Sequence, residues 1–224
     1  MTRRILRFDS IDSTQRAATG EPLGTVVVAD QQTAGQGRHG HEWHSEPGNG
    51  LYCSIVLQPR PLLTLALGLA AVDAIAQSTG IACDIRWPND LMLDGRKVAG
   101  ILVQLVNQSA IAGFGINVNH TSFPPGFDAT SLRIHSNRTH SRETILSALL
   151  PAIDEMVKAG NDTILRLFTH ASSYVAGRRV TVDQPTGVIL GTTAGLDPDG
   201  FLVVRQDDGT DTLILAGGVR AAGS

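Results

Sequence analysis

Lysine is nearly absent from this chain of 224 residues, which contains only Lys97 and Lys158. Arginine supplies the other basic side chains, and the formal net charge is −3. No long basic run occurs, so the charge pattern does not favour nucleic acid as a partner, although it leaves room for a local positive pocket. Because lysine is so rare here, a lysine in a polar turn is worth examining as a functional group.

Cysteines and long apolar runs are also scarce. Cys53 and Cys83 lie in unrelated apolar settings without metal or redox spacing, so we expect buried thiols of a cytosolic protein. The most apolar segment, 62–76, is interrupted by Asp73 and is too short to span a bilayer. The first ten residues carry charge with no apolar core after them, so no signal peptide is predicted. We therefore expect a cytoplasmic protein without a membrane partner.

The hydrophobic pattern predicts strands and helices along most of the chain. The 42% hydrophobic content is enough for one large domain, or for a medium domain and a small one. Strands are predicted at 3–8, 24–30, 50–59, 83–88 and 110–119, and a hairpin around the Asp94-Gly95 turn over 91–106. Helices are predicted at 12–20, 62–79, 141–158 and 161–174. The segments 31–49 and 119–140 are predicted to be irregular, and long loops in compact domains are usually functional or disordered.

The character of the sequence changes after Gly177. Short strands are expected at 178–182, 186–196, 200–206 and 211–217, joined by turns such as DPDG and DDGT. This spacing is typical of a small β-barrel of about fifty residues. We therefore predict a boundary near residue 176, with one domain at 1–176 and a second at 177–224.

A glycine-rich stretch, AGQGRHGHEW at 34–43, is the first candidate for a binding site. Its glycines allow consecutive N–H groups to converge on an anion, and Arg38 adds a planar fork for phosphate or carboxylate. The spacing is not that of a P-loop, and a strand rather than a helix follows, which argues against a dinucleotide site. A mobile surface loop is the alternative. Trp43 is either a core side chain or a flat cover for a purine ring.

Three further stretches combine polar side chains with strand ends. In RWPND, Pro88 forces a turn that exposes Asn89 and Asp90, which suits plain turn chemistry or a polar cluster beside a ligand or divalent cation. In GRKVAGIL, Lys97 opens a strand and is either a surface lysine or a site residue. GFGINVN puts Asn117 at a strand end. Each of these signals is weak alone.

The combination of these stretches is specific. DSTQ, QTAGQGRHGHEW, RWPNDL, GRKVAGIL and GFGINVN, in this order and at these intervals, resemble the catalytic domain of bacterial biotin–protein ligases. The segment GFLVVRQDDG, with ILAGGV after it, is similar to the SH3-like tail of that family. The resemblance covers nearly the whole chain. It implies an α+β fold, in which a class II synthetase-like catalytic domain with a mixed sheet and helices precedes a small SH3-like β-barrel.

The resemblance also implies roles for individual residues. The implied biotin site consists of Ser13, Thr14, Gln15, Gln32, Gly35, Gln36, Gly37, Arg38, Lys97 and Gly100. The implied ATP site consists of Arg38, Trp43, Asn89, Asp90, Lys97 and Asn117, with Trp43 packed on adenine and Asn117 near the base. Lys97 and Arg38 are expected to carry catalysis, with Lys97 as the cation between the biotin carboxylate and the α-phosphate. No metal ligand is assigned.

The activity that this resemblance implies is that of a biotin–[acetyl-CoA-carboxylase] ligase. Such an enzyme activates biotin with ATP to biotinyl-5′-AMP and transfers biotin to one lysine of a biotin carboxyl carrier protein domain of acetyl-CoA carboxylase or a related carboxylase. ATP and Mg²⁺ form the substrate complex, and no tightly bound cofactor is expected. Some relatives carry an N-terminal helix-turn-helix, which we do not find here, so direct operator binding is not expected. A homodimer is left open.

Two departures from the family pattern and two rival functions remain. Gln36 occupies the position of the family loop's first arginine, and Arg86 occupies that of a family lysine. We therefore expect residue 36 to bind the biotin carboxylate or the adenylate less tightly than the family norm.

One rival is a lipoate ligase or octanoyltransferase on the same scaffold. A transferase would need a nucleophilic cysteine, and Cys83 lies in an apolar strand with no histidine close in sequence. The other rival is a non-catalytic biotin- or nucleotide-binding module.

Overall fold

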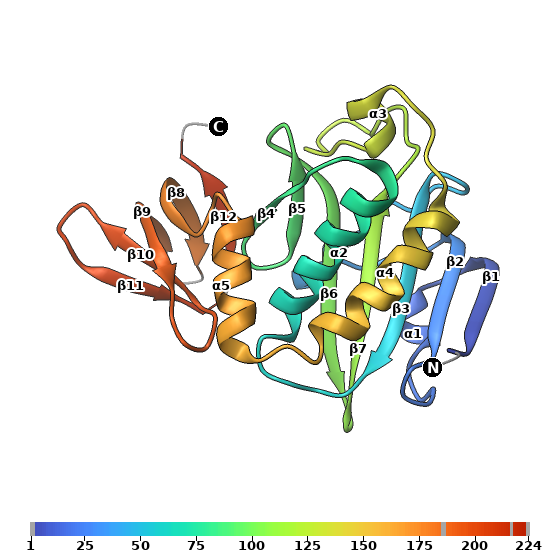
Figure 1. Cartoon of the computed structure of the whole chain (residues 1–224). Coiled ribbons are helices and arrows are strands. Elements are labelled where there is room, and N and C mark those ends of the chain that lie inside the picture. Colours follow the sequence, from blue (N-terminus) through green and yellow to red (C-terminus); the bar gives the residue numbers. More distant parts are fainter. Residues whose placement is uncertain (1–2, 185–186, 216, 223–224) are drawn as a thin grey trace.

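A seven-stranded mixed sheet forms the larger part of the molecule (Figure 1). The structure, a computed structural model, describes residues 3–184, 187–215 and 217–222. The strands of this sheet are β1 (Ile5–Ile11), β2 (Val26–Gln32), β3 (Gly50–Leu57), β4 (Asp84–Arg86), β5 (Asp90–Leu93), β6 (Arg96–Val106) and β7 (Ser109–Asn117). Their order is β1-β2-β3-β7-β6-β5-β4, with only β1 and β2 parallel. This arrangement confirms the predicted mixed sheet.

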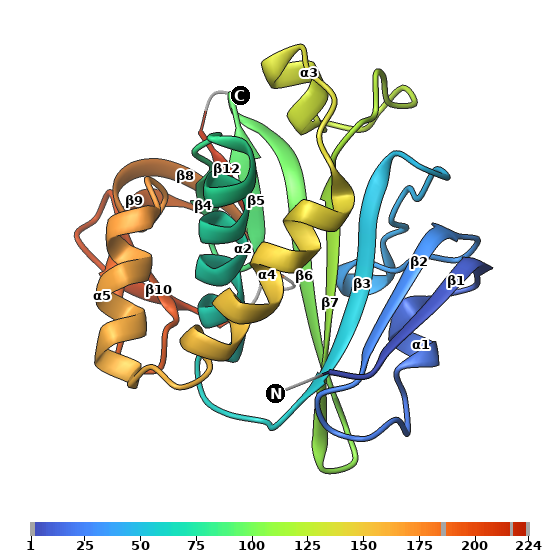
Figure 2. The ribbon, with the colours of Figure 1, turned by 45° about the vertical axis from the view of Figure 1, so that its right-hand side comes forward.

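Two long helices cover one face of this sheet (Figure 2). α2 (Leu63–Thr79) and α4 (Arg142–Met156) share one apolar cluster with side chains of β3, β6 and β7. Side chains alternate along a strand, so every second residue of β6 and β7 points to the opposite face. On that face the sequence has glycine at 100, 113 and 115, and the missing side chains leave the sheet hollow there.

Regular structure occurs in both segments that were predicted to be irregular. Within 31–49, β2 continues to Gln32 and a 3₁₀ turn follows at Arg38–Gly40. Within 119–140 the chain forms α3 (Leu132–Ser136), whose N-cap Ser131 accepts a hydrogen bond from the Ile134 N–H. A helix of this length has too few turns to show apolar periodicity, so the sequence pattern missed it. The predicted helices at 12–20 and 161–174 are shorter, as α1 (Thr14–Ala17) and α5 (Asn161–Ala171).

A second, wholly antiparallel sheet follows, as the predicted β-rich C-terminal part requires. It consists of β8 (Ala176–Gln184), β9 (Gly187–Leu196), β10 (Leu202–Gln206), β11 (Asp211–Ile214) and β12 (Gly218–Ala221). The strand order is β11-β10-β9-β8-β12. Its own apolar core contains Val180, Val182, Leu202, Val204 and Ile214, all fully buried. Thr186, the first residue of one predicted strand, and Ala216, inside another, lie outside the described residues.

The two sheets share an apolar cluster. Ile85 of β4, Trp87 of the turn after it and Phe168 of α5 pack with the core side chains of the second sheet. The indole Nε1 of Trp87 donates a buried hydrogen bond of 2.9 Å to the carbonyl of Gly200. The division at residue 176 therefore remains a prediction, since burial is continuous across it. No helix among the described residues is long and apolar enough to cross a membrane.

Candidate active site

A cavity of about 680 Å³ opens on the uncovered face of the large sheet. The segment 34–45, called the lid below, contributes Gln36, Gly37, Arg38 and Trp43 to its lining. β5, β6 and the turn before them contribute Asn89, Asp90, Lys97 and Gly100. Ser13, Thr14, Gln15 and Gln32 line it from the side of α1 and β2. Twelve of the predicted site residues, far apart in sequence, thus surround one cavity.

The indole of Trp43 packs against two glycines of the large sheet. Gly100 and Gly115 are cross-strand neighbours in β6 and β7. A Cβ built on Gly115 would lie 2.3 Å from Cε2 of Trp43, and one on Gly100 would lie 3.1 Å from its Cζ3. The indole Nε1 is buried and has no hydrogen-bond partner among the residues that the structure describes. Glycine at 115 therefore leaves room for a flat ring against the sheet, and a side chain at 100 would press on the edge of that ring.

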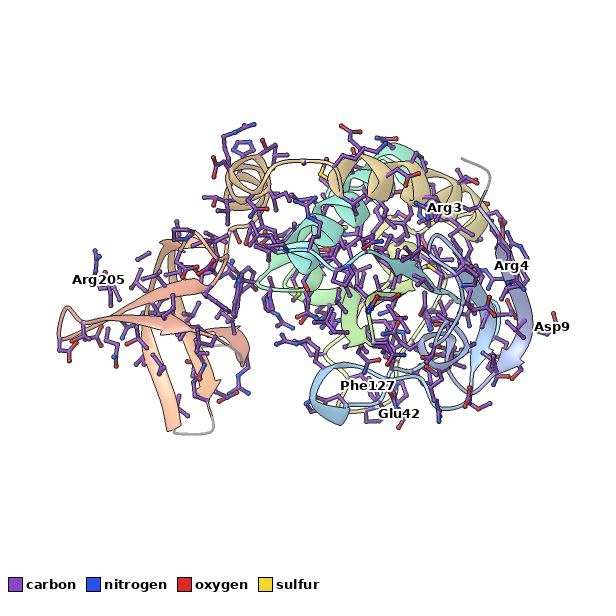
Figure 3. All side chains as sticks on the ribbon, turned by 90° about the horizontal axis from the view of Figure 1, so that it is seen from below. Arg3, Arg4, Asp9, Glu42, Phe127 and Arg205 are labelled. Carbon is purple, nitrogen blue, oxygen red and sulfur yellow. The ribbon has the colours of Figure 1, made fainter. Side chains whose placement is uncertain are left out.

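The lid is a short hairpin rather than an irregular loop. The Gly37 N–H donates to the His41 carbonyl at 2.7 Å, and the Trp43 N–H donates to the Gly35 carbonyl at 3.0 Å. A Cβ on Gly35 would lie 2.8 Å from the Trp43 carbonyl oxygen, so this glycine is required by packing inside the lid. Gly35 does not line the cavity. At the end of the lid the His44 ring lies 5.9 Å from that of Phe127, which is labelled in Figure 3.

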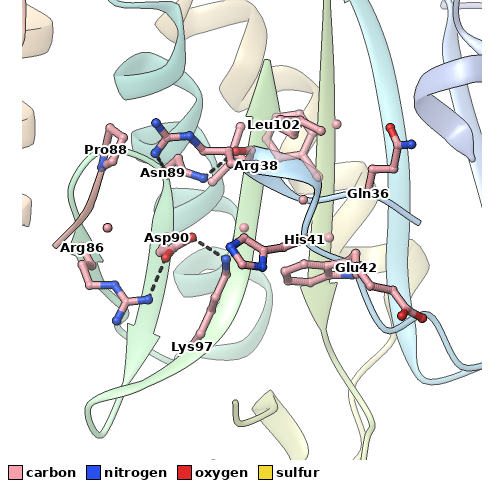
Figure 4. Close-up of a pocket in the computed structure, with 18 of the residues that line it drawn as sticks. Gln36, Arg38, His41, Glu42, Arg86, Pro88, Asn89, Asp90, Lys97 and Leu102 are labelled. Carbon is pink, nitrogen blue, oxygen red and sulfur yellow. Dashed lines mark hydrogen bonds and ion pairs between the residues drawn. The ribbon is translucent and has the colours of Figure 1, made fainter. Parts of the chain in front are cut away.

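Lys97 and Arg86 share one carboxylate at the cavity wall (Figure 4). Lys97 Nζ lies 2.6 Å from Oδ1 of Asp90, and Arg86 Nη2 lies 2.8 Å from Oδ2. Burial favours the neutral acid, but the two cations outweigh it and lower the pKa of Asp90 below its usual value. Lys97 Nζ also lies 5.2 Å from the ring centroid of Trp43. The wall therefore holds a fixed ammonium group beside a flat aromatic ring.

Arg38 connects the lid to the turn before β5. Its Nη1 donates to Oδ1 of Asn89 at 2.9 Å, and Nδ2 of Asn89 donates to the carbonyl of Ile101 at 2.9 Å (Figure 4). Asn89 is thereby fixed in one orientation, with its oxygen toward the lid. Burial lowers the pKa of the Arg38 guanidinium, and the charge of Asp90 opposes this effect. Arg38 thus fastens the lid over the cavity through one hydrogen bond.

The end of the cavity near α1 has polar atoms without partners. Oγ of Ser13 and Oε1 of Gln15 are buried and make no hydrogen bond within the described residues. The Gln15 amide cannot turn freely, because its Nε2 donates to the Ile111 carbonyl at 3.2 Å. Thr14 and Gln32 are hydrogen-bonded to each other, with the Thr14 N–H donating to Oε1 of Gln32 at 2.8 Å. Buried polar atoms without partners cost free energy, so this end favours a ligand with hydrogen-bonding groups.

Two predicted positions need separate comment. Asn117 does not line the cavity, since its amide is buried and donates to the carbonyl of Thr130 at 3.1 Å. Gln36 lines the cavity but its side chain is exposed and makes no hydrogen bond within the part of the chain described. Arg86, noted in the sequence only as a departure, is a lining residue that could supply positive charge.

The sequence did not indicate the residues that β8 and β12 bring to the cavity. Arg220 of β12 and Asp183 of β8 line it and form an ion pair of 2.7 Å. Their strands pair with each other, Asp183 opposite Gly218, in the second sheet. No local pattern could have shown this approach, because it depends on how the second sheet packs on the first.

Both parts of the chain match known families. Residues 8–120 match the Biotin/lipoate A/B protein ligase family, and residues 175–219 match the Biotin protein ligase C terminal domain. The chain belongs to the biotin/lipoate protein ligase family. This membership confirms the resemblance and, with the two sheets described above, the predicted fold class.

Curated members of the family align with nearly the whole chain. The bifunctional ligase/repressor BirA of Bacillus spizizenii is 33% identical over 96% of this chain and 74% of its own length. A biotin--[acetyl-CoA-carboxylase] ligase of Mycobacterium tuberculosis is 31% identical over 92% of this chain and 82% of its own.

Solved structures of one family member superpose on nearly all of the chain. The biotin protein ligase from Aquifex aeolicus in complex with biotin and ATP has a TM-score of 0.90 at 30% identity, covering 99% of this chain and 100% of that one. The apo structure of the same enzyme has a TM-score of 0.85 at 28% identity with the same coverage. The whole fold is thus shared with both forms of that enzyme.

Proposed function

We propose that this protein is a biotin–[acetyl-CoA-carboxylase] ligase, which activates biotin with ATP to biotinyl-5′-AMP and transfers it to a lysine of a carrier domain. The observation that carries the proposal is one cavity with two chemically different ends. One end has a fixed ammonium, Lys97, and a guanidinium, Arg38. The other end has the unpaired polar atoms of Ser13 and Gln15. An acid with a polar ring system, joined to a nucleotide, suits both ends.

In the first half-reaction, a carboxylate oxygen of biotin attacks the α-phosphorus of ATP, and the bond to the β-phosphate oxygen breaks. Pyrophosphate leaves with the electron pair. Two anions must approach each other for this step, and fixed cations in a partly buried site offset their repulsion. Lys97 is proposed to stand between the carboxylate and the α-phosphate, and Arg38 to hold the adenylate under the lid. Trp43 is proposed to pack on adenine.

In the second half-reaction, the ε-amine of an acceptor lysine attacks the acyl carbon of the adenylate. The bond from that carbon to the phosphate oxygen breaks, AMP leaves, and the amine loses a proton as the amide forms. The acceptor is proposed to be a biotin carboxyl carrier protein domain. Its lysine has to come from outside, because Lys97 is ion-paired and Lys158 does not line the cavity. A cytoplasmic location remains a prediction.

Mg²⁺ enters this proposal together with the nucleotide. Among the described residues no group of three or more His, Cys, Asp or Glu side chains could hold a metal ion. Both oxygens of Asp90 are ion-paired, so this carboxylate does not fit a resident cation. On the phosphate side of the nucleotide, Asn89 is proposed as a contact and Asp90 as the carboxylate that holds Lys97 and Arg86 there, with the ion as part of the substrate complex.

The rival acids are disfavoured by the same cavity. Lipoate and octanoate would leave the polar atoms of Ser13 and Gln15 unpaired, whereas the ureido group of biotin has donors and an acceptor for them.

A transferase with a cysteine nucleophile is also disfavoured. Burial raises the pKa of Cys53 and that of Cys83 to about 12, and neither lines the cavity. The Mycobacterium tuberculosis relative, which is named a biotin--[acetyl-CoA-carboxylase] ligase, supports the same choice.

Pyrophosphate exchange tests the choice of acid. The purified chain is incubated with ATP, labelled pyrophosphate and one acid at a time: biotin, lipoate or octanoate. Label is expected to enter ATP with biotin only. Equal or faster exchange with lipoate or octanoate would overturn the assignment, and biotin binding by calorimetry without any exchange would favour a non-catalytic module.

A further inference from the structure

Asn117 is a predicted ATP-binding residue that lies behind the cavity wall. It is the last residue of β7, and 4% of its surface is exposed. Its Nδ2 donates to the carbonyl of Thr130 at 3.1 Å. Thr130 belongs to the segment between β7 and α3, which turns back toward the start of β6. One N–H of the Asn117 amide is therefore used inside the protein.

The segment 128–130 holds the backbone of Lys97. Pairing of β6 with β7 ends where Ala99 lies opposite Ile116. Beyond that point the Lys97 N–H donates to the Asp128 carbonyl at 3.3 Å, and the Thr130 N–H donates to the Lys97 carbonyl at 2.9 Å. Lys97 and Ala129 form a parallel bridge. The segment thus takes the place beside Lys97 that β7 has left.

On the β5 side the backbone near Lys97 is irregular. Leu91 pairs with Ala99, but the next residue of β5, Met92, pairs with Lys97, so the register skips Val98. A bulge of this kind interrupts the ladder and bends the strand. Because of this bulge, pairing with β5 alone would hold the Lys97 backbone less firmly than an unbroken ladder would. Its direction depends on the contacts that 128–130 makes on the other side.

The segment 128–130 is itself fastened at its C-terminal end. Ser131 Oγ donates to the His120 carbonyl at 2.6 Å, and Asn117 holds the Thr130 carbonyl. All three side chains, those of Asn117, Thr130 and Ser131, are buried. Of these three residues only Asn117 belongs to the large sheet, where it is the last residue of β7. It therefore joins the sheet to the segment that replaces β7.

We propose that Asn117 is a positioning residue for Lys97. By holding the Thr130 carbonyl it fixes the segment that fixes the Lys97 backbone, and so sets where the ammonium group stands beside Asp90 and Trp43. The inference rests on the proposed function, which gives Lys97 its part in adenylate formation. The predicted contact of Asn117 with adenine is a different role, because a base contact contributes to ATP affinity.

Steady-state pyrophosphate exchange of two variants separates these roles. Asn117→Leu keeps the volume and removes the donor, and Asn117→Ala removes both. If Asn117 positions Lys97, kcat falls by about 10- to 100-fold, since a shift of about 1 Å in a reacting group costs that much. Loss of a base contact alone would instead raise the KM for ATP and leave kcat unchanged.

Asn119 offers a matched control two residues away. Its Nδ2 donates to the His140 carbonyl at 3.0 Å, and its Oδ1 accepts from the His140 N–H at 2.9 Å, so Asn119→Ala breaks comparable bonds away from Lys97. This variant is expected to keep the wild-type kcat, and thermal unfolding of each variant is recorded beside the assay.

Several results would overturn the positioning role. These are an unchanged kcat in both Asn117 variants, a raised KM for ATP as the sole effect, an equal loss in Asn119→Ala, or unfolding of both Asn117 variants at the assay temperature. A wild-type protein without biotin-dependent exchange would instead refute the proposed function, so the two failures are distinguishable.

Discussion

At the scale of single residues, two cations of the cavity wall are arranged around one carboxylate. One carboxylate oxygen of Asp90 is ion-paired with Lys97 and the other with Arg86. These two cations lower the pKa of Asp90, although burial by itself would raise it. The ammonium of Lys97 is thereby held in place before any substrate arrives. Such preorganisation stabilises developing charge without reorganisation during the reaction.

Replacing Lys97 should remove adenylate formation while leaving the fold intact. In Lys97→Ala we expect biotin-dependent pyrophosphate exchange to fall by about 100- to 1,000-fold or more, because the central cation is lost. Lys158→Ala is the control, since Lys158 is the other lysine and does not line this cavity. Exchange at the wild-type rate in Lys97→Ala would contradict the assignment.

Arg38→Gly should weaken the hold on the intermediate. The hydrogen bond from Arg38 to Asn89 fastens the lid, so its loss should let biotinyl-AMP escape and label lysines of unrelated proteins. Biotin blotting of albumin incubated with enzyme, biotin and ATP measures this escape. Arg138→Gly, at an exposed position, is the control. A bystander that remains unlabelled while the variant still forms adenylate would argue against Arg38 as the clamp.

His120 makes stability depend on pH. Burial lowers the pKa of His120 from 6.5 to about 4, with Glu46 opposing and His44 adding to the effect. Between these values the unfolded chain binds more protons than the folded one, so the free energy of unfolding falls as pH decreases from about 6.5 to about 4. The loss should be on the order of 2–3 kcal/mol. Urea unfolding across this range measures it.

Two substitutions isolate the contribution of His120. His120→Gln should flatten the pH dependence, whereas His170→Gln, at an exposed position of α5, should leave it unchanged. Equal pH dependence in all three proteins would mean that another group is responsible.

Much of the site could be predicted residue by residue, but not all of it. The lid, the RWPND turn and Lys97 were recognisable because their stretches, each weak alone, occur together in the order and at the intervals of a known family. Asn117 was assigned to the nucleotide from such a stretch, yet its partner Thr130 is distant from any motif. Arg220 and Asp183 gave no local signal, since strand pairing and sheet packing bring them to the cavity.

At the scale of elements, glycine determines how β6, β7 and the lid fit together. Gly115 and Gly100 accommodate Trp43, and Gly113 accommodates the amide of Gln15, whose Oε1 would lie 2.8 Å from a Cβ there. The sequence predicted both strands but not the reason for their glycines. That reason is a contact across the sheet face, which strand periodicity does not encode.

A methyl group at position 115 should displace Trp43 and disturb the proposed nucleotide site. In Gly115→Ala the new Cβ would overlap the indole, so we expect the KM for ATP to rise about tenfold, equivalent to about 1.4 kcal/mol. Gly160→Ala is the control, because a Cβ there meets nothing within 4 Å. An unchanged KM for ATP in Gly115→Ala would show that the packing of Trp43 against Gly115 does not matter for nucleotide binding.

At the scale of the whole molecule, the two sheets are joined by burial rather than by a flexible linker. One apolar cluster runs from Trp87 and Phe168 into the second sheet, and Trp87 donates to Gly200. The change in sequence character near residue 176 predicted the second sheet. It could not predict that β4 and α5 share a core with this sheet, because those contacts are long-range.

Shared burial should make the two parts unfold together. Calorimetry is expected to show one transition, and Trp87→Phe should lower the free energy of unfolding by about 1–3 kcal/mol because the Gly200 carbonyl loses its donor. Two separate transitions in the wild-type protein would show instead that the parts at 1–176 and 177–224 are independent domains.

The central claim is that one cavity both makes biotinyl-AMP and delivers biotin to a carrier lysine. A two-step assay tests it directly: the protein is loaded with biotin and labelled ATP, pyrophosphate is removed, and a biotin carboxyl carrier domain is then added. We predict stoichiometric release of AMP and attachment of biotin to a single lysine, located by peptide mass spectrometry. Bound adenylate that never reaches the carrier, or no adenylate at all, would contradict the account.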